Sequence, residues 1–321
     1  GGFLLTATKN WVQVRGWHGL PLIGLVAAWL FERVGMAFGA GWPPLLFRLS
    51  NLLFLAAIVA MLLGTLLRHR RQDSFADNPL FYVVLPAFVA AKLLVLDEAH
   101  FHAGVTMAIG LYRMAFLVML ERTLTQFMKG LFQVELLRDR RLDGAIKLLG
   151  LALVFQAWLP VPLAAVLLGL LALLLAVRFV GWRPGLGFTR IDLAVMFLGY
   201  LAILAQLLVE AAGLLAAPAW VGSVSVHLFT VGVMGLIIPA MFVRISKGHT
   251  GRKVVFDAGD KLVLWIMLAA LVLRVVLPQL LPAAYGRWVH LSAGAWFLGF
   301  GILGLRLLPR LIAPRIDGKE H

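Results

Sequence analysis

The stretch VHLFTVGVMGLIIPAMFVRISKGHTGR, residues 226–252, decides the fold of this chain. It reads as an apolar helix with His227 near one end and a basic loop with Arg244, Lys247 and Arg252 at the other. The 17 residues from His227 to Arg244 span about 26 Å of helix, close to one hydrocarbon thickness of a bilayer. A histidine inside a membrane helix is unfavourable in free energy, so His227 is a candidate functional residue.

The composition of the chain points to lipid as its solvent. Of its 321 residues, 62% are hydrophobic and only 14% are charged, which is more apolar surface than a water-soluble domain needs. The chain has no cysteine, and this excludes disulfides, thiolate metal sites, iron–sulfur clusters and cysteine nucleophiles. A bound metal would need histidine, methionine, carboxylate or backbone ligands.

Hydropathy predicts an all-α fold, a polytopic transmembrane helix bundle with about ten complete spans. The predicted spans are 19–38, 45–67, 79–97, 101–122, 144–159, 161–180, 190–215, 220–244, 260–281 and 287–308.

The opening GGFLLTATKNW is apolar but too short to span a bilayer. We interpret it as the last turns of a truncated transmembrane helix, which would give about twelve helices in a full-length chain. The predicted organisation is the end of this helix and a cytoplasmic loop over 1–18, a single transmembrane helical domain over 19–313, and a cytoplasmic tail over 314–321.

The positive charges fall mainly on one side of the predicted bundle. When the loops are assigned alternately to the two sides, all but six of the 29 lysines and arginines collect on one side, and the six are Arg33, Arg48, Lys92, Arg113, Arg274 and Arg287. By the positive-inside rule the basic side, with the C-terminus, is cytoplasmic. The net charge of +14 therefore indicates membrane topology and contact with anionic lipid, not nucleic-acid binding.

Four histidines, at the outer ends of predicted helices, are candidate cofactor ligands: His100, His102, His227 and His290. Neutral imidazole is a common ligand of haem iron and of copper, and helices of a bundle can bring such ligands together. His227 is the candidate metal ligand, and nearby arginines are candidate partners of haem propionates, namely Arg48, Arg113 and Arg274. Polar residues at helix ends also lie near headgroups at little free-energy cost, so ordinary interface positions remain an alternative.

Arg113 lies near the middle of a predicted span, too deep for its side chain to reach water easily. By depth, its anionic partner is Glu210 or Glu121, and a structural ion pair competes with a substrate or propionate contact. At the basic end of the 226–252 stretch, GHTG suits a tight turn. We expect a cytoplasmic polar knot there, formed by Arg244, His249, Thr250 and Arg252.

The block from His227 to Arg252, with GGFLLTATKNW, ERTLTQFMKG at 121–130 and WRP at 182–184, resembles the NnrS family of bacterial membrane proteins. The resemblance covers essentially the whole chain. It implies about twelve helices in the inner membrane, haem and copper as cofactors, and a role in tolerating nitric oxide made during denitrification or host attack. It also implies a histidine-rich motif upstream of Gly1, which would add ligands to the same outer leaflet.

These observations lead to the hypothesis of an inner-membrane haem protein, with copper as a second metal, that binds nitric oxide or a related small ligand and protects against nitrosative stress. Conversion, sensing and sequestration of nitric oxide all fit it. The alternative is a secondary transporter of a small solute without cofactors, since many helices, a deep arginine and a proline-containing helix fit that class too.

Overall fold

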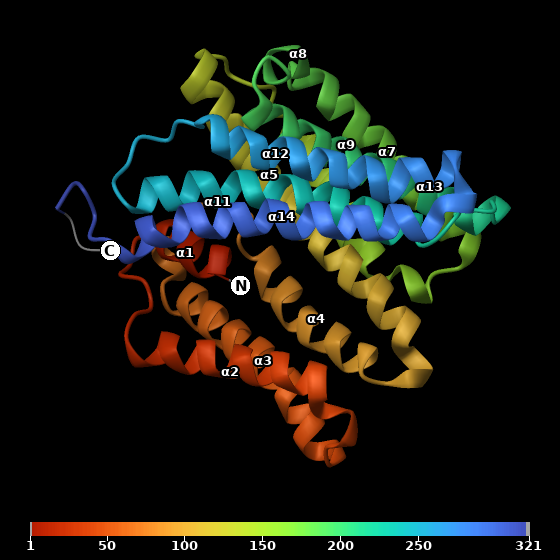
Figure 1. Cartoon of the computed structure of the whole chain (residues 1–321), viewed down its shortest axis with the longest axis horizontal. Coiled ribbons are helices and arrows are strands. Elements are labelled where there is room, and N and C mark those ends of the chain that lie inside the picture. The colour runs from red at the N-terminus through yellow and green to blue at the C-terminus, as the bar shows by residue number, and fades with distance from the viewer. Residues whose placement is uncertain (1, 319–321) are drawn as a thin grey trace. The chain divides into compact units, whose positions relative to one another are not determined.

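The computed structural model describes residues 2–318, so Gly1 of the predicted helix end and residues 319–321 of the predicted tail lie outside the described residues. Over the described residues the chain is helical and has no strand (Figure 1), which confirms the predicted all-α class. It falls into two compact units. Unit 1 is Gly1–Tyr112 with Val154–Trp158, and unit 2 is Arg113–Leu153 with Leu159–His321.

Unit 1 contains the first helices of the chain: α1 (Gly2–Trp11), α2 (Leu20–Phe38), η1 (Gly39–Gly41), α3 (Pro44–Arg68), η2 (Arg70–Gln72), α4 (Leu80–Val95), η3 (Glu98–His100) and the start of α5 (Phe101–Phe132). Most of the short helix η4 (Leu153–Trp158) belongs to it as well.

Unit 2 contains the rest of α5 and the remaining helices: α6 (Arg140–Ala152), α7 (Val161–Gly181), α8 (Pro184–Gly187), α9 (Ile191–Ala216), α10 (Val224–His227), η5 (Leu228–Met234), α11 (Gly235–His249), α12 (Ala258–Leu271), η6 (Val272–Val276), α13 (Leu277–Leu280), η7 (Pro282–Ala284) and α14 (Tyr285–Ile312).

Eight helical stretches among the described residues are long and apolar enough to cross a membrane: Leu20–Gly41, Pro44–Arg68, Glu98–Phe132, Val161–Gly181, Ile191–Ala216, Val224–His249, Ala258–Leu280 and Pro282–Ile312. The predicted count of about ten was approximate. The predicted span 79–97 is the shorter apolar helix Leu80–Val95. The predicted span 144–159 corresponds to α6, a helix of 13 residues that begins with charged side chains, followed by η4, which has 6 residues, and it is not among these eight stretches.

The charged residues of α6 explain its position in unit 2. Lys147 contacts the Glu121 carboxylate of α5 at 2.9 Å, and Asp143 lies 3.3 Å from Nη1 of Arg178 on α7. All four side chains are at most 15% exposed. Removing one partner from a buried ion pair is strongly destabilising, because the other charge is left buried and unpaired. These pairs therefore hold α5, α6 and α7 together.

Within unit 1, α2 and α3 pack as a hairpin joined through the sequence GWPP at residues 41–44. Gly35 lies so close to α3 that a Cβ atom there would come within 2.1 Å of the Ser50 hydroxyl. Small residues allow this close approach of membrane helices. Glu32, buried on α2, accepts a hydrogen bond from Lys92 at 3.0 Å and so ties α2 to α4.

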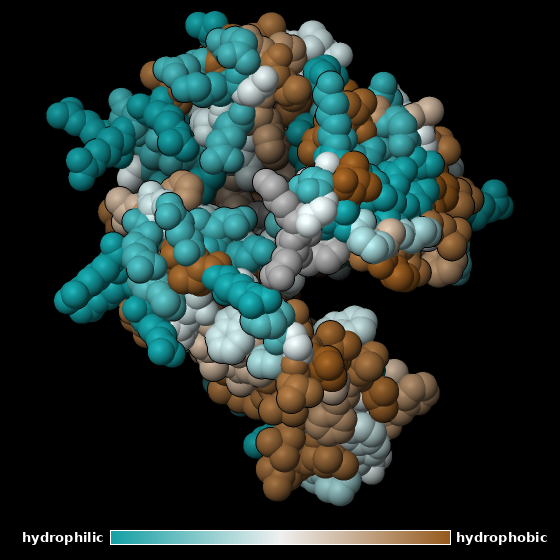
Figure 2. Space-filling view, turned by 90° about the vertical axis from the view of Figure 1, so that its left-hand side faces the viewer, coloured by the Kyte–Doolittle hydropathy of each residue, from teal (hydrophilic) through white to brown (hydrophobic). Residues whose placement is uncertain are grey.

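Helix α9 is the most buried of the candidate spans and contacts α7, α11, α12 and η5 in unit 2. Its Gly199 faces α11, and a Cβ atom at this position would lie 2.6 Å from Cγ1 of Ile237. Helices α11, α12 and α14 also contact one another (Figure 1). Figure 2 looks at the left-hand end of the view in Figure 1 and shows hydrophilic residues over much of this face, with hydrophobic residues in its lower part. This is the end that the charge pattern predicts to be cytoplasmic.

Candidate functional site

The helix of the 226–252 stretch changes its hydrogen-bonding pattern directly after His227. His227 ends α10, and Leu228–Met234 forms a π-helical segment before the α-helix resumes at Gly235. A second π-helical segment, Val272–Val276, interrupts the neighbouring helix between α12 and α13. Single π turns inside α-helices occur frequently at functional sites.

His227 and Arg274 meet beside these two segments. Nη2 of Arg274 lies 2.8 Å from Nε2 of His227, and the Nδ1 atom of the same imidazole lies 2.7 Å from the backbone carbonyl of Ser223. A carbonyl oxygen only accepts, so Nδ1 carries the proton and Nε2 accepts from the guanidinium. His227 is therefore a half-buried, neutral imidazole with one orientation and a defined lone pair.

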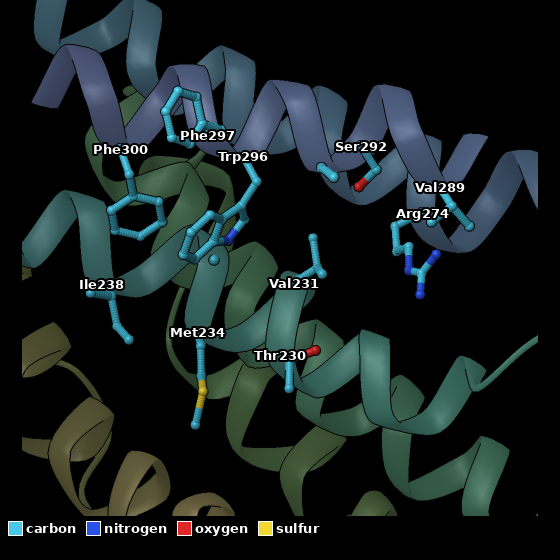
Figure 3. A pocket seen from close by; sticks show the side chains of 12 residues that line it. Thr230, Val231, Met234, Ile238, Arg274, Val289, Ser292, Trp296, Phe297 and Phe300 are labelled. Atoms are coloured by element: carbon cyan, nitrogen blue, oxygen red, sulfur yellow. The ribbon is translucent and has the colours of Figure 1, made fainter. Parts of the chain in front are cut away.

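Arg274 has one further unused donor. Its Nη1 atom is buried without a hydrogen-bond partner. Arg274 also lines a groove between α14 and the η5–α11 segment, as Figure 3 shows. Thus the guanidinium contacts His227 and at the same time borders a groove in unit 2.

Arg113 is fully buried and has the partner expected from its depth. Its Nη1 atom donates to Gln206 at 2.9 Å and to Glu210 at 3.1 Å, both on α9. The amide of Gln206 also donates to the Ser225 hydroxyl at 3.1 Å. This network links α5, α9 and α10, and Ser225 is two residues from His227. The arrangement agrees with the structural ion pair considered for Arg113.

The other predicted outer residues are less constrained. His290, exposed on α14, contacts the Gly286 carbonyl of its own helix through Nδ1 at 2.7 Å. In unit 1, His100 contacts Asp97 at 2.9 Å, and this hydrogen bond holds the pKa of the Asp97 carboxyl below its ordinary value. His102 packs edge-on against Phe101. Arg48 is exposed on α3. The participation of His100, His102, His290 and Arg48 in one site remains a prediction.

The residues of the predicted polar knot, Arg244, His249, Thr250 and Arg252, form hydrogen bonds and ring contacts at the basic ends of the helices. Arg244 donates to Asp192 at 2.6 Å and stacks on Phe127 with its guanidinium carbon 4.1 Å from the ring centroid. Thr250, fully buried, donates from its hydroxyl to the Ser246 carbonyl. The backbone N–H of Arg252 donates to the Lys247 carbonyl at 2.8 Å.

The C-terminal segment covers the GHTG turn. Arg315 donates to the His249 carbonyl at 3.0 Å, and the Ile316 N–H donates to the Thr250 carbonyl at 3.2 Å. The knot is therefore held largely through backbone atoms. Such contacts position helix ends but offer little side-chain chemistry.

A second ion-pair cluster at this end was not predicted. Lys247 is paired with Asp260, which is fully buried, and Arg306 of α14 is paired with Asp257. Asp257 and Asp260 also form a capping box at the start of α12. The D-x-x-D pattern before an apolar run was the available sequence signal for this cap.

The described residues are better suited to hold haem than to hold a copper ion with side chains of this chain alone. Haem iron needs one or two axial ligands, and His227 has the fixed ring and the Nδ1–carbonyl hydrogen bond that metal-ligating histidines usually show. A copper site needs several ligands together. Among residues 2–318 no three histidine, aspartate or glutamate side chains group in this way.

Comparison with protein families matches residues 1–315 to the family described as NnrS protein. No match was found among curated proteins or among solved structures. The family match covers nearly the whole chain, including both π-helical segments and the His227–Arg274 contact. The chain therefore belongs to the NnrS family, and at the level of that family it is a membrane protein of the nitric-oxide response.

Proposed function

We propose that this protein is a haem-containing protein of the bacterial inner membrane that protects the cell against nitric oxide, including the nitrosative stress that accompanies denitrification. One observation carries the haem assignment. His227 is held as a neutral imidazole whose Nε2 lone pair lies beside a guanidinium with an unused donor. Membership of the NnrS family supports the link to nitric oxide.

In this proposal His227 would hold the haem iron through Nε2, which Arg274 would release, and the freed guanidinium would pair with a haem propionate. Of the three arginines predicted for that role, Arg274 is the one in contact with a predicted histidine, whereas Arg113 is engaged with Glu210. When bound, haem supplies an iron centre that takes nitric oxide as a ligand. Copper remains a candidate second metal, to be measured in the same samples.

The proposed orientation places the Lys- and Arg-rich loops and the C-terminus in the cytoplasm, and His227 in the outer half of the membrane. Nitric oxide is small and apolar enough to enter from the lipid. A water-filled path to His227 is then unnecessary, which agrees with a site between apolar helices.

The test is the visible spectrum and the metal content of the purified full-length protein. We expect a Soret band and bound iron, and we expect His227→Ala to lose most of its haem. His249→Ala, at the opposite end of the same candidate span, is the matched control and should keep it. A preparation without Soret band, iron or copper would instead favour the cofactor-free transporter. Unchanged haem in His227→Ala would remove His227 as the ligand.

A further inference from the structure

A half-open groove of about 730 Å³ lies in unit 2 between α14 and the η5–α11 segment (Figure 3). Small-molecule sites in proteins are commonly about 300–1,000 Å³. Two aromatic side chains at the groove, Trp296 and Phe297, are 43% and 79% exposed on α14. The groove is partly open and α14 is a candidate membrane span, so we infer that its mouth faces lipid. A ligand of this size would enter from the bilayer.

The groove has an apolar end and a polar end. In Figure 3, Phe300, Trp296 and Ile238 lie toward one end. The rings of Trp296 and Phe300 form a continuous wall, with centroids 4.3 Å apart. Toward the other end lie Ser292 and Arg274. This gradient suits an amphiphile whose chain follows the aromatic wall and whose head reaches the arginine.

The polar end presents both donors and acceptors. Arg274 offers donors, including the buried Nη1 atom that has no partner. The hydroxyls of Thr230 and Ser292 already donate to the carbonyls of Val226 and Ala270, each at 2.9 Å. Each hydroxyl has one proton, so both oxygens are left with lone pairs as acceptors.

This combination selects the head group of the ligand. An ionised phosphate or carboxylate head would accept from Arg274 but would have no proton to donate to the hydroxyl oxygens of Thr230 and Ser292. A ring with carbonyl or hydroxyl oxygens satisfies both kinds of partner, and its flat face suits the wall of Trp296 and Phe300. We propose that the groove is a binding site for a membrane-dissolved amphiphile of the quinone or hydroquinone class.

The site is distinct from the proposed haem ligand but is connected to it. His227 does not line the groove, whereas Arg274 lines it and also donates to His227. In the apoprotein a ligand head at the polar end therefore shares the guanidinium with the imidazole, and with haem bound it would share it with the propionate. Occupancy of the groove should change the environment of His227 through Arg274.

The probe is a benzoquinone with a ten-carbon chain, or its hydroquinone, added to the full-length protein in neutral phosphatidylcholine nanodiscs. We expect saturable quenching of tryptophan fluorescence, because a ring bound beside Ser292 would lie one helical turn from Trp296. Trp296→Phe should remove most of this quenching. Trp265→Phe, an exposed tryptophan of α12 that does not line the groove, is the matched control and should keep it.

Two substitutions test the polar end. Arg274→Gln should weaken binding of both forms about tenfold or more, as expected for loss of a hydrogen bond from a charged donor. The exposed Arg287→Gln on the same unit should not. Thr230→Val, of equal shape, should weaken the hydroquinone about fivefold and the quinone less, because only the hydroquinone donates a proton to Thr230.

Binding that survives both Trp296→Phe and Arg274→Gln would overturn the proposal. Equal binding of a ten-carbon alkyl phosphate would also overturn it and would make the groove a phosphate-lipid site. Haem content, measured in the same samples, separates this inference from the proposed function. Loss of haem in His227→Ala with quinone binding intact supports both, and absent quinone binding in a haem-loaded protein refutes the groove site alone.

Discussion

Arg274 donates from Nη2 to Nε2 of His227 across 2.8 Å, and this hydrogen bond joins the end of α10 to the π-helical segment η6. The other ring nitrogen of His227 is already bonded to the Ser223 carbonyl. In the apoprotein, Arg274 therefore supplies the hydrogen-bond donor for Nε2 of His227.

Arg274→Leu should lower the free energy of unfolding of the apoprotein by about 1–3 kcal/mol, because it leaves Nε2 of His227 without a donor. Arg274→Lys keeps a donor and should lose less. Thermal unfolding in detergent measures both, with the exposed Arg287→Leu as control. Equal stability of Arg274→Leu and Arg287→Leu would show that this hydrogen bond contributes nothing to folding.

Glu210→Leu should destabilise the protein by about 3–5 kcal/mol, since it leaves the guanidinium of Arg113 buried without its carboxylate. The double replacement Arg113→Met with Glu210→Leu removes the charge as well and should be less destabilising than Glu210→Leu alone. Unfolding curves of the two variants and the wild type test this order. If the double variant is the least stable of the three, the pair is not acting as a buried ion pair.

Gly199→Val should destabilise unit 2 by about 1–3 kcal/mol, because its new side chain would collide with Ile237 and separate α9 from α11. Gly169→Val on α7 is the matched control, since nothing lies within 4 Å of a Cβ atom there. Melting temperatures of both variants provide the measurement. A Gly169→Val variant as unstable as Gly199→Val would indicate a general helix effect of valine.

Asp139, at the start of α6, accepts hydrogen bonds from the backbone N–H groups of Leu142 and Arg141, and these hold its pKa below the ordinary aspartate value. A lowered pKa means that the ionised cap stabilises the folded state. This contribution is complete above the ordinary pKa of about 3.9 and disappears as the pH falls through the lower pKa of the folded state.

Asp139→Ala should therefore melt at a lower temperature than the wild type at neutral pH, and the difference should shrink at acidic pH. Asp139→Asn keeps a capping oxygen and should show a smaller pH dependence. Melting curves recorded from pH 7 to pH 3 measure this trend. A difference that stays constant over the whole range would exclude the charge of Asp139 as its cause.

Several features of the site were predictable from the sequence. Depth along a helix follows from residue position, so Glu210 and Glu121 were both identified as possible partners of Arg113. The choice between them depends on which faces of the helices meet. In the structure Arg113 pairs with Glu210, whereas Glu121 contacts Lys147. The hydrogen bonds around His227 likewise depend on tertiary packing, since His227 uses the Ser223 carbonyl and the Ser225 hydroxyl accepts from Gln206.

The predicted span over 144–159 shows a limit of hydropathy. Its C-terminal half is apolar enough to suggest a membrane helix, but Asp143 and Lys147 pair with Arg178 and Glu121 inside unit 2. An average over a window does not distinguish residues that face lipid from residues that face a partner helix. The two π-helical segments were not predicted from the sequence.

The sequence by itself determined that lipid surrounds the protein, that the fold is helical, where the spans approximately lie, and which polar residues, such as Arg113 and His227, lie within them. The hydrocarbon core of a bilayer offers no hydrogen-bond partners to the backbone, so long apolar segments satisfy their N–H and C=O groups internally by forming helices. Only the tertiary structure decided which polar side chains meet. The His227–Arg274 contact, the Arg113–Glu210 pair and the two-ended groove all depend on how helices distant in sequence are rotated against each other, and helix rotation is set by packing.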